Sequence, residues 1–204
     1  MKIIGLTGGI ASGKNFIAEI FAQNGAAIFD ADAEVHGLID LDKSTIAEIK
    51  KHFPESFVDK KIERKILGKI VFSDEKKLKI LEKIIHPRVR KIYQKFLSNA
   101  KKQRAKFVVL NIPLLLESKA YKCDYIVAII PSKKIQKERF LAREKQKHPT
   151  ATVAELTTKF EQIRKKQLSN LHRKKYADFV IKNDGLKTHA AAVVKKILES
   201  ILHQ

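Results

Sequence analysis

The most constraining feature of this sequence is a glycine-rich stretch near its beginning, GGIASGKN at residues 8–15. It fits the pattern G-x-x-x-x-G-K, in which glycines let successive backbone N–H groups point into one concavity that binds phosphate oxygens. The stretch follows the apolar, β-branched run KIIGLT and precedes residues 14–24, whose apolar side chains recur at helical spacing. A strand, such a loop and a helix in this order predict a binding site for nucleotide phosphates.

The loop and the first turn after it supply the candidate ligands of the nucleotide. These are Gly8, Gly9, Ala11, Ser12, Gly13, Lys14, Asn15 and Phe16. Lys14 is expected to reach the β and γ phosphates of ATP and to act in catalysis. Asn15 departs from the pattern, because a Ser or Thr whose hydroxyl ligates Mg²⁺ normally stands there. Since Mg²⁺ accepts an amide oxygen, we expect weaker metal binding at Asn15 and not a loss of activity.

Apolar runs typical of buried strands recur along the chain and alternate with helical segments. Strands are predicted at 2–7, 26–30, 107–112, 125–130 and 179–182, and helices at 14–24, 132–146, 152–175 and 186–203. Gly25 is a candidate left-handed residue that ends a helix, and Ser132 is a candidate N-cap. This alternation predicts an α/β three-layer sandwich with a five-stranded parallel sheet, as in P-loop NTPases. Residues 33–102 show only helical periodicity and are predicted to be a helical insertion.

Two acids and two arginines are candidates for phosphoryl-transfer chemistry. Asp30 and Asp32 stand at the carboxyl end of the second strand, where open α/β sheets bind ligands. We assign Asp32 to catalysis, as the group that accepts the proton of an acceptor hydroxyl. Asp30 is left with a structural role, such as helix capping, or with a supporting role behind the reacting groups. Arg139 and Arg143 share one helical face and are candidates to neutralise the transferred phosphoryl group, with a solvated basic face as the alternative.

The formal net charge of +20 is the feature that most favours another class of protein. Such a charge is a usual mark of nucleic-acid binding, so a basic nucleic-acid-binding NTPase is an alternative. The lysines are spread over predicted helices, however, which favours an anionic small substrate and no nucleic acid. A single cysteine, Cys123, excludes an intramolecular disulfide and fits a cytoplasmic protein. No signal peptide is expected, nor a membrane span, which needs roughly 20 apolar residues.

Several separated motifs resemble the dephospho-coenzyme A kinase family over essentially the whole chain. They are GLTGGIASGK (5–14), FDAD (29–32), VFSD (71–74), LEKIIHP (81–87), IPLLLE (112–117), ERFLAR (138–143), Gln167 and YADFVIKNDG (176–185). The first is generic to many NTPases, whereas LEKIIHP, IPLLLE and ADFVIKNDG together are specific. The resemblance implies transfer of the ATP γ-phosphate to the ribose 3′-hydroxyl of dephospho-coenzyme A, the last step of coenzyme A biosynthesis, with Mg²⁺ as cofactor.

The resemblance also implies how the chain is organised. It implies one kinase domain with a nucleotide-binding core at 1–32 and 103–204, a helical substrate lobe at about 33–102 and a lid at about 138–167. The arginine helix with Arg139 and Arg143 belongs to this lid. We expect the protein to act as a monomer.

On this mapping Arg64, His86 and Glu117 become candidates near the acceptor substrate, although a His before Pro more often caps or satisfies a loop. No acidic residue ends the strand at 107–112, where Asn111 stands, so the second magnesium-holding acid of other phosphate-loop enzymes is absent there. Asp32 or water must serve instead. Another small-molecule kinase, such as a nucleoside monophosphate kinase, is the nearest alternative.

Overall fold

The computed structural model describes residues 1–113, 115–118, 120–185 and 187–203, without the side chains of Glu117, Ser118 and Lys187. The chain forms two compact units, one of Met1–Phe29 with Gln103–Gln204 and the other of Asp30–Lys102. Among the described residues, no helix combines the length and the apolar character that crossing a membrane requires.

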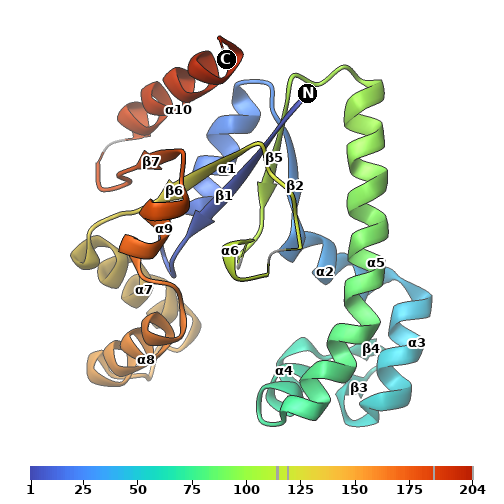
Figure 1. The fold of residues 1–204 in the computed structure, drawn as a ribbon. Helices are drawn as coiled ribbons and strands as arrows, with labels where there is room; N and C mark the ends of the chain where they lie inside the picture. Colours follow the sequence, from blue (N-terminus) through green and yellow to red (C-terminus); the bar gives the residue numbers. More distant parts are fainter. Residues whose placement is uncertain (114, 119, 186, 204) are drawn as a thin grey trace. The chain divides into compact units, whose positions relative to one another are not determined.

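A five-stranded sheet with the strand order β2-β5-β1-β6-β7 is the centre of the fold (Figure 1). Its strands are β1 (Lys2–Gly8), β2 (Ala27–Asp30), β5 (Phe107–Asn111), β6 (Tyr125–Ile129) and β7 (Phe179–Ile181). β1 pairs in parallel with β5 on one side and with β6 on the other. The predicted fold class is therefore confirmed, and so are the five predicted strands to within a residue or two at each end.

Helices flank this sheet in the first unit. They are α1 (Lys14–Gln23), α6 (Leu115–Ser118), α7 (Lys133–Lys147), α8 (Val153–Lys166), α9 (Asn170–Tyr176) and α10 (Lys187–Leu202). α1 and α10 cover one face, where Ile4 and Leu6 of β1 belong to the main buried apolar cluster. Gly5, between these two residues, faces α6 instead, because successive strand residues point to opposite faces. A side chain at Gly5 would collide with Leu115, so α6 packs directly on the strand backbone.

Cap residues explain where several of these helices begin and end. Gly25 follows α1 with φ of 84°, the left-handed conformation expected of it, and Ser132 caps α7 by accepting a hydrogen bond from the backbone N of Ile135. The single helix predicted over 152–175 is wrong, since the chain turns extended at Gln167 and starts again at α9. Ser169 causes the restart, because its hydroxyl accepts a hydrogen bond from the backbone N of His172 at 3.1 Å.

The second unit is mainly helical. It contains α2 (Ala31–Leu41), α3 (Lys43–His52), a 3₁₀ turn (Pro54–Ser56), α4 (Arg64–Phe72) and α5 (Glu75–Lys102). It also contains a hairpin of two short strands, β3 (Phe57–Val58) and β4 (Lys61–Ile62), that the sequence did not predict. Asp59 and Lys60 form its turn, and both have the positive φ angles that a type I′ hairpin turn requires. α5 continues through Pro87 without ending there.

Candidate active site

The glycine-rich stretch forms a tight loop between the end of β1 and the start of α1. Ala11 and Gly13 both have positive φ angles, 54° and 82°, and the backbone N of Ser12 donates to the carbonyl oxygen of Gly9 at 3.1 Å. An added side chain at Gly8 would collide with Ser12, whose own side chain is buried. The loop therefore closes on itself just before the first turn of α1, where the backbone N–H groups at the start of a helix and the helix dipole favour an anion.

Two side chains from elsewhere in the first unit rest against Gly13. Asn183, just after β7, donates from Nδ2 to the carbonyl oxygen of Ser12 at 2.9 Å. Nη1 of Arg139, a residue of α7, would lie 3.4 Å from a Cβ added at Gly13. This nitrogen is buried, and the described residues offer it no hydrogen-bond partner. A buried guanidinium N–H of this kind is a donor suited to a phosphate oxygen.

Two glutamines hold the loop from the side of α7 and α8. Gln136, buried in the first turns of α7, donates from Nε2 to the carbonyl oxygen of Ile10 at 3.1 Å. Gln167, at the end of α8, accepts from the backbone N of Ile10 at 2.8 Å. The two backbone polar groups of Ile10 are thus bound to Gln136 of α7 and to Gln167 at the end of α8. Because α7 also carries Arg139, the contact with Gln136 fixes the arginine relative to the loop.

A chain of three side chains lies at the start of α1. The Lys14 ammonium donates to Oδ1 of Asn111, and Nδ2 of Asn111 donates to Oδ1 of Asn15 at 3.1 Å. Asn111 is the last residue of β5 and is 2% exposed. Its position opposite Leu6 in the β1–β5 pair puts it beside the loop.

The second predicted arginine, Arg143, makes different contacts from Arg139. Its Nε lies 3.5 Å from Oε1 of Glu144, its guanidinium lies 5.7 Å from the centre of the Phe140 ring, and its side chain is about half exposed. The described contacts therefore place Arg139, and not Arg143, against the phosphate loop.

Aromatic and ionic contacts hold helices α7 and α8 together. Phe140 and Phe160 are fully buried, with ring centres 5.5 Å apart. Glu144, 6% exposed, accepts a hydrogen bond from Lys159 of α8 at 2.6 Å. This hydrogen bond, with added attraction from Arg143, holds the pKa of the Glu144 carboxyl below its usual range.

Three further residues of the first unit bear on the sequence predictions. Phe16 is partly buried and packs against the buried apolar cluster. The side chain of Glu117 lies outside the described residues. Cys123 is partly buried next to Gly5, and burial raises the pKa of its thiol to about 11, so it is a protonated, packed side chain at neutral pH.

The remaining candidates lie in the second unit. Asp30 caps α2 by accepting from the backbone N of Ala33 at 3.1 Å, which confirms its structural assignment. Asp32 is exposed in the first turn of the same helix. Asp40, two turns further along, forms an ion pair with Arg64 in which Oδ1 and Nε are 3.5 Å apart. Spacings of four residues place Asp32, His36 and Asp40 along one side of α2.

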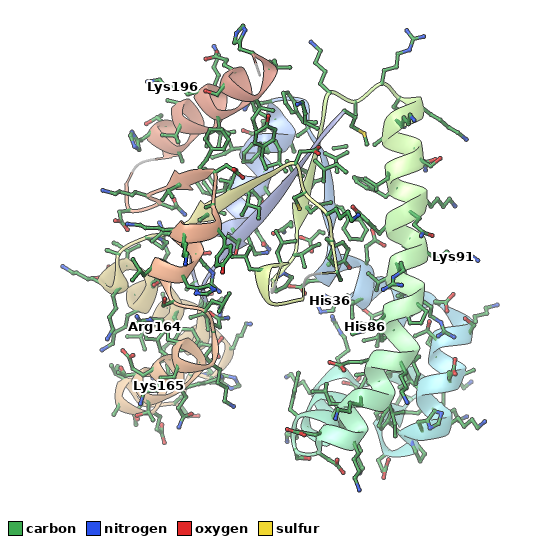
Figure 2. All side chains as sticks on the ribbon, viewed as in Figure 1. His36, His86, Lys91, Arg164, Lys165 and Lys196 are labelled. Atoms are coloured by element: carbon green, nitrogen blue, oxygen red, sulfur yellow. The ribbon has the colours of Figure 1, made fainter. Side chains whose placement is uncertain are left out.

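His86 lies within α5 and not in a loop, so the alternative of a loop or cap residue is wrong. Its side chain is exposed. Helix α5 contacts α2, and Figure 2 shows His86 on the former and His36 on the latter.

Four residues that contact the loop were not predicted as site residues: Asn111, Gln136, Gln167 and Asn183. Asn111 ends β5 and Asn183 lies two residues after the end of β7, and polar residues at the carboxyl ends of strands are a usable signal. The two glutamines carry no such signal, because their contacts depend on how α7 and α8 pack.

The site offers Mg²⁺ a small set of ligands. No cluster of three or more His, Cys, Asp or Glu side chains able to hold a metal occurs in the part of the chain that the structure describes. Asn15 presents an amide oxygen beside the loop, and Mg²⁺ is commonly held by one or two protein oxygens together with substrate phosphates. Asn15 therefore fits Mg²⁺ as a neutral protein ligand beside the phosphates of the nucleotide.

A phosphate loop that joins the first strand of a parallel sheet to the first helix defines the class of phosphate-loop nucleotide-binding proteins. Comparison with known proteins narrows the class. Residues 2–189 match the dephospho-CoA kinase family, and the chain is 38% identical to a dephospho-CoA kinase of Bartonella henselae over 98% of this chain and 100% of that one. The chain belongs to the dephospho-CoA kinase family.

Solved structures agree with this membership. A protein from Thermus thermophilus matches with a TM-score of 0.78 and 27% identity, over 99% of this chain and 96% of that one. A dephospho-CoA kinase from Campylobacter jejuni matches with a TM-score of 0.67 and 28% identity, over 98% and 96%.

Proposed function

We propose that this protein transfers the γ-phosphoryl group of ATP to the ribose 3′-hydroxyl of dephospho-coenzyme A, which completes coenzyme A. The observation that carries the proposal is the phosphate loop with Arg139 against it, because a buried guanidinium nitrogen to which the described residues offer no partner matches an incoming phosphate. Family membership over nearly the whole chain supports the choice of acceptor. The single cysteine, a partly buried thiol, is compatible with action in the cytoplasm.

The reaction is a single displacement. The carboxylate of Asp32 accepts the proton of the 3′-hydroxyl, whose oxygen bonds to the γ-phosphorus while the bond from phosphorus to the bridging oxygen breaks and leaves ADP. Lys14 and Arg139 place positive charge at the phosphate oxygens, where negative charge concentrates in the transition state. Mg²⁺ bound with ATP supplies further charge neutralisation, and Asn15 is the residue of the loop that would hold it.

The other predicted residues bind the acceptor substrate or belong to the lid that closes over the site. Arg64, His86 and Glu117 bind the acceptor in this proposal, and residues 33–102 form its lobe. The pair of Arg64 with Asp40 is partly exposed, so an anionic acceptor group can compete for this arginine. Residues 138–167 act as a lid, and Arg143 turns from Glu144 to the phosphates when the lid closes.

Product analysis tests the reaction directly. Incubation with ATP and dephospho-coenzyme A is expected to give ADP and a product with the new phosphate on the 3′ oxygen. A panel of nucleoside monophosphates serves as competing acceptors, and a preference for one of them would replace this proposal by the nearest alternative.

The Asp32→Asn variant tests the assigned base. We expect kcat to fall by about 10²–10⁴-fold with little change in the KM for ATP, because the lost group acts on the acceptor proton. The Glu34→Gln variant is the matched control, since it neutralises a carboxylate in the same first turn of α2. Turnover in Asp32→Asn close to that of Glu34→Gln would contradict the assignment.

A further inference from the structure

Asn111 is a buried side chain with contacts to two residues of the phosphate site. Its Oδ1 accepts a hydrogen bond from the Lys14 ammonium, and its Nδ2 donates to Oδ1 of Asn15. At 2% exposure, its polar atoms must find partners within the protein. Two of these partners, Lys14 and Asn15, stand where phosphate-loop enzymes have the residues for the γ-phosphate and for Mg²⁺.

The chemistry of Lys14, Asn111 and Asn15 determines which atom donates and which accepts in each of these hydrogen bonds. An ammonium group only donates, so Asn111 must turn its oxygen toward Lys14. The amide nitrogen of Asn111 then faces Asn15, which must present its oxygen in turn. Asn111 therefore orients both neighbours at once, and neither amide can be reversed without loss of a hydrogen bond.

This arrangement differs from the usual one in both positions that hold the metal. Phosphate-loop NTPases such as Ras hold Mg²⁺ with a loop Ser or Thr and an Asp from a neighbouring strand. Here the corresponding positions are Asn15 and the end of β5, Asn111, and both side chains are neutral amides. The amide oxygen of Asn15 has two lone pairs, so it can accept from Asn111 and still ligate a cation.

We infer that Asn111 is a positioning residue that works with Asn15 as one unit, holding Lys14 for the phosphates and Asn15 as a neutral Mg²⁺ ligand. The inference rests on the proposed function. It implies that the usual residues, Ser at position 15 and Asp at position 111, serve this site only when they are introduced together.

Each single replacement breaks the arrangement in its own way. Asn111→Asp places a carboxylate oxygen against Oδ1 of Asn15, where two acceptors repel, and pairs more strongly with Lys14, which then serves the phosphates less well. Asn15→Ser removes the oxygen that Nδ2 of Asn111 contacts and leaves a buried donor without that partner. In the double variant the serine hydroxyl can donate to the new carboxylate, which also returns a negative charge for the metal.

The test is isothermal titration of ADP, in MgCl₂ and in EDTA, into the wild type, both single variants and the double variant Asn15→Ser/Asn111→Asp. In MgCl₂ we expect each single variant to bind ADP about five- to tenfold more weakly than the wild type. We expect the double variant to bind within about threefold of the wild type, where independent effects would multiply to a loss of roughly 25- to 100-fold. The loss of ADP affinity caused by Asn15→Ser is expected to be smaller in EDTA than in MgCl₂. If Asn15 had a purely structural role, the loss would be the same in both buffers.

Asn24→Ser is the matched control, because it makes the same substitution at the opposite end of α1, where the side chain only caps the helix. Its ADP affinity should equal that of the wild type in both buffers, and the melting temperatures of all variants show that each is folded. Losses that simply multiply in the double variant, with ADP binding intact in the wild type, would overturn this inference alone. Failure of the wild type to bind ADP would overturn the proposed function and the inference together.

Discussion

At the scale of single residues, Gly13 and Gly25 differ in the reasons that favour glycine. Both have a left-handed backbone conformation, but only one of them lacks space for a side chain. Their φ angles are nearly equal, 82° and 84°. A side chain at Gly13 would collide with Nδ2 of Asn183 and press on Arg139, whereas a side chain at Gly25 would contact nothing within 4 Å. Backbone strain is therefore common to both positions, and crowding belongs to Gly13 alone.

The Gly13→Ala variant is expected to lose about 2–4 kcal/mol of unfolding free energy, from strain and from overpacking. The matched Gly25→Ala variant should lose only about 1–2 kcal/mol, from strain. Urea denaturation measures both losses, and ADP titration should show weakened binding in Gly13→Ala only. Equal losses of stability in the two variants would mean that the packing of Asn183 and Arg139 on the loop is loose.

At the scale of elements, the α7–α8 pair is joined by the buried carboxylate of Glu144. Glu144→Gln removes the charge but keeps the shape, so the short hydrogen bond from Lys159 weakens. We expect a loss of about 1–2 kcal/mol near pH 7. The exposed Glu138→Gln on the same helix is the control, with an expected change within about 0.5 kcal/mol.

The pH dependence of this loss has a definite sign. The folded protein lowers the pKa of Glu144, so its stabilising contribution is present above the unfolded value of about 4.3 and is lost as the pH falls through the folded pKa. Denaturation of wild type and Glu144→Gln from pH 7 down to pH 3 should show the gap between them narrowing. A gap that stays constant over this range would show that the carboxylate charge does not join the helices.

The elements and contacts of this protein differ in how far the sequence predicts them. Buried strands carry continuous apolar runs and were placed correctly, whereas β3 and β4, with two residues each, are too short to show alternation. The break before α9 had a signal, the cap residue Ser169, that helical periodicity on both sides obscured. The position of Asn111 at the end of a strand was a signal for a site residue, but its contacts with Lys14 and Asn15 could not be predicted, because they depend on β5 lying next to β1. Local patterns predict the loop, while strand order decides which side chains complete it.

At the scale of the whole molecule, the net charge of +20 lies largely on separate helices. Among the described residues, six helices carry basic residues in their last turns, namely α3 (Lys50, Lys51, His52), α4 (Lys69), α5 (Lys101, Lys102), α7 (Lys145, Lys147), α8 (Arg164, Lys165, Lys166) and α9 (Arg173, Lys174, Lys175). Cations at the carboxyl end of a helix interact favourably with its dipole. Figure 2 labels Lys91 on α5, Arg164 and Lys165 on α8, and Lys196 on α10, so these basic side chains also belong to separate helices.

This dispersal leads to a prediction about nucleic acid. Binding to a duplex depends on how many phosphates the protein neutralises together, and charges placed at separate helix ends contact few phosphates at a time. Fluorescence anisotropy with a generic 20-base-pair duplex should therefore give a Kd weaker than about 10 µM in 150 mM NaCl, within the range of non-specific binding. Lys14→Ala should leave this weak binding unchanged while abolishing ADP binding. A Kd below about 1 µM that rises steeply with salt would instead favour a nucleic-acid-binding NTPase, because only a continuous basic surface releases many counterions at once.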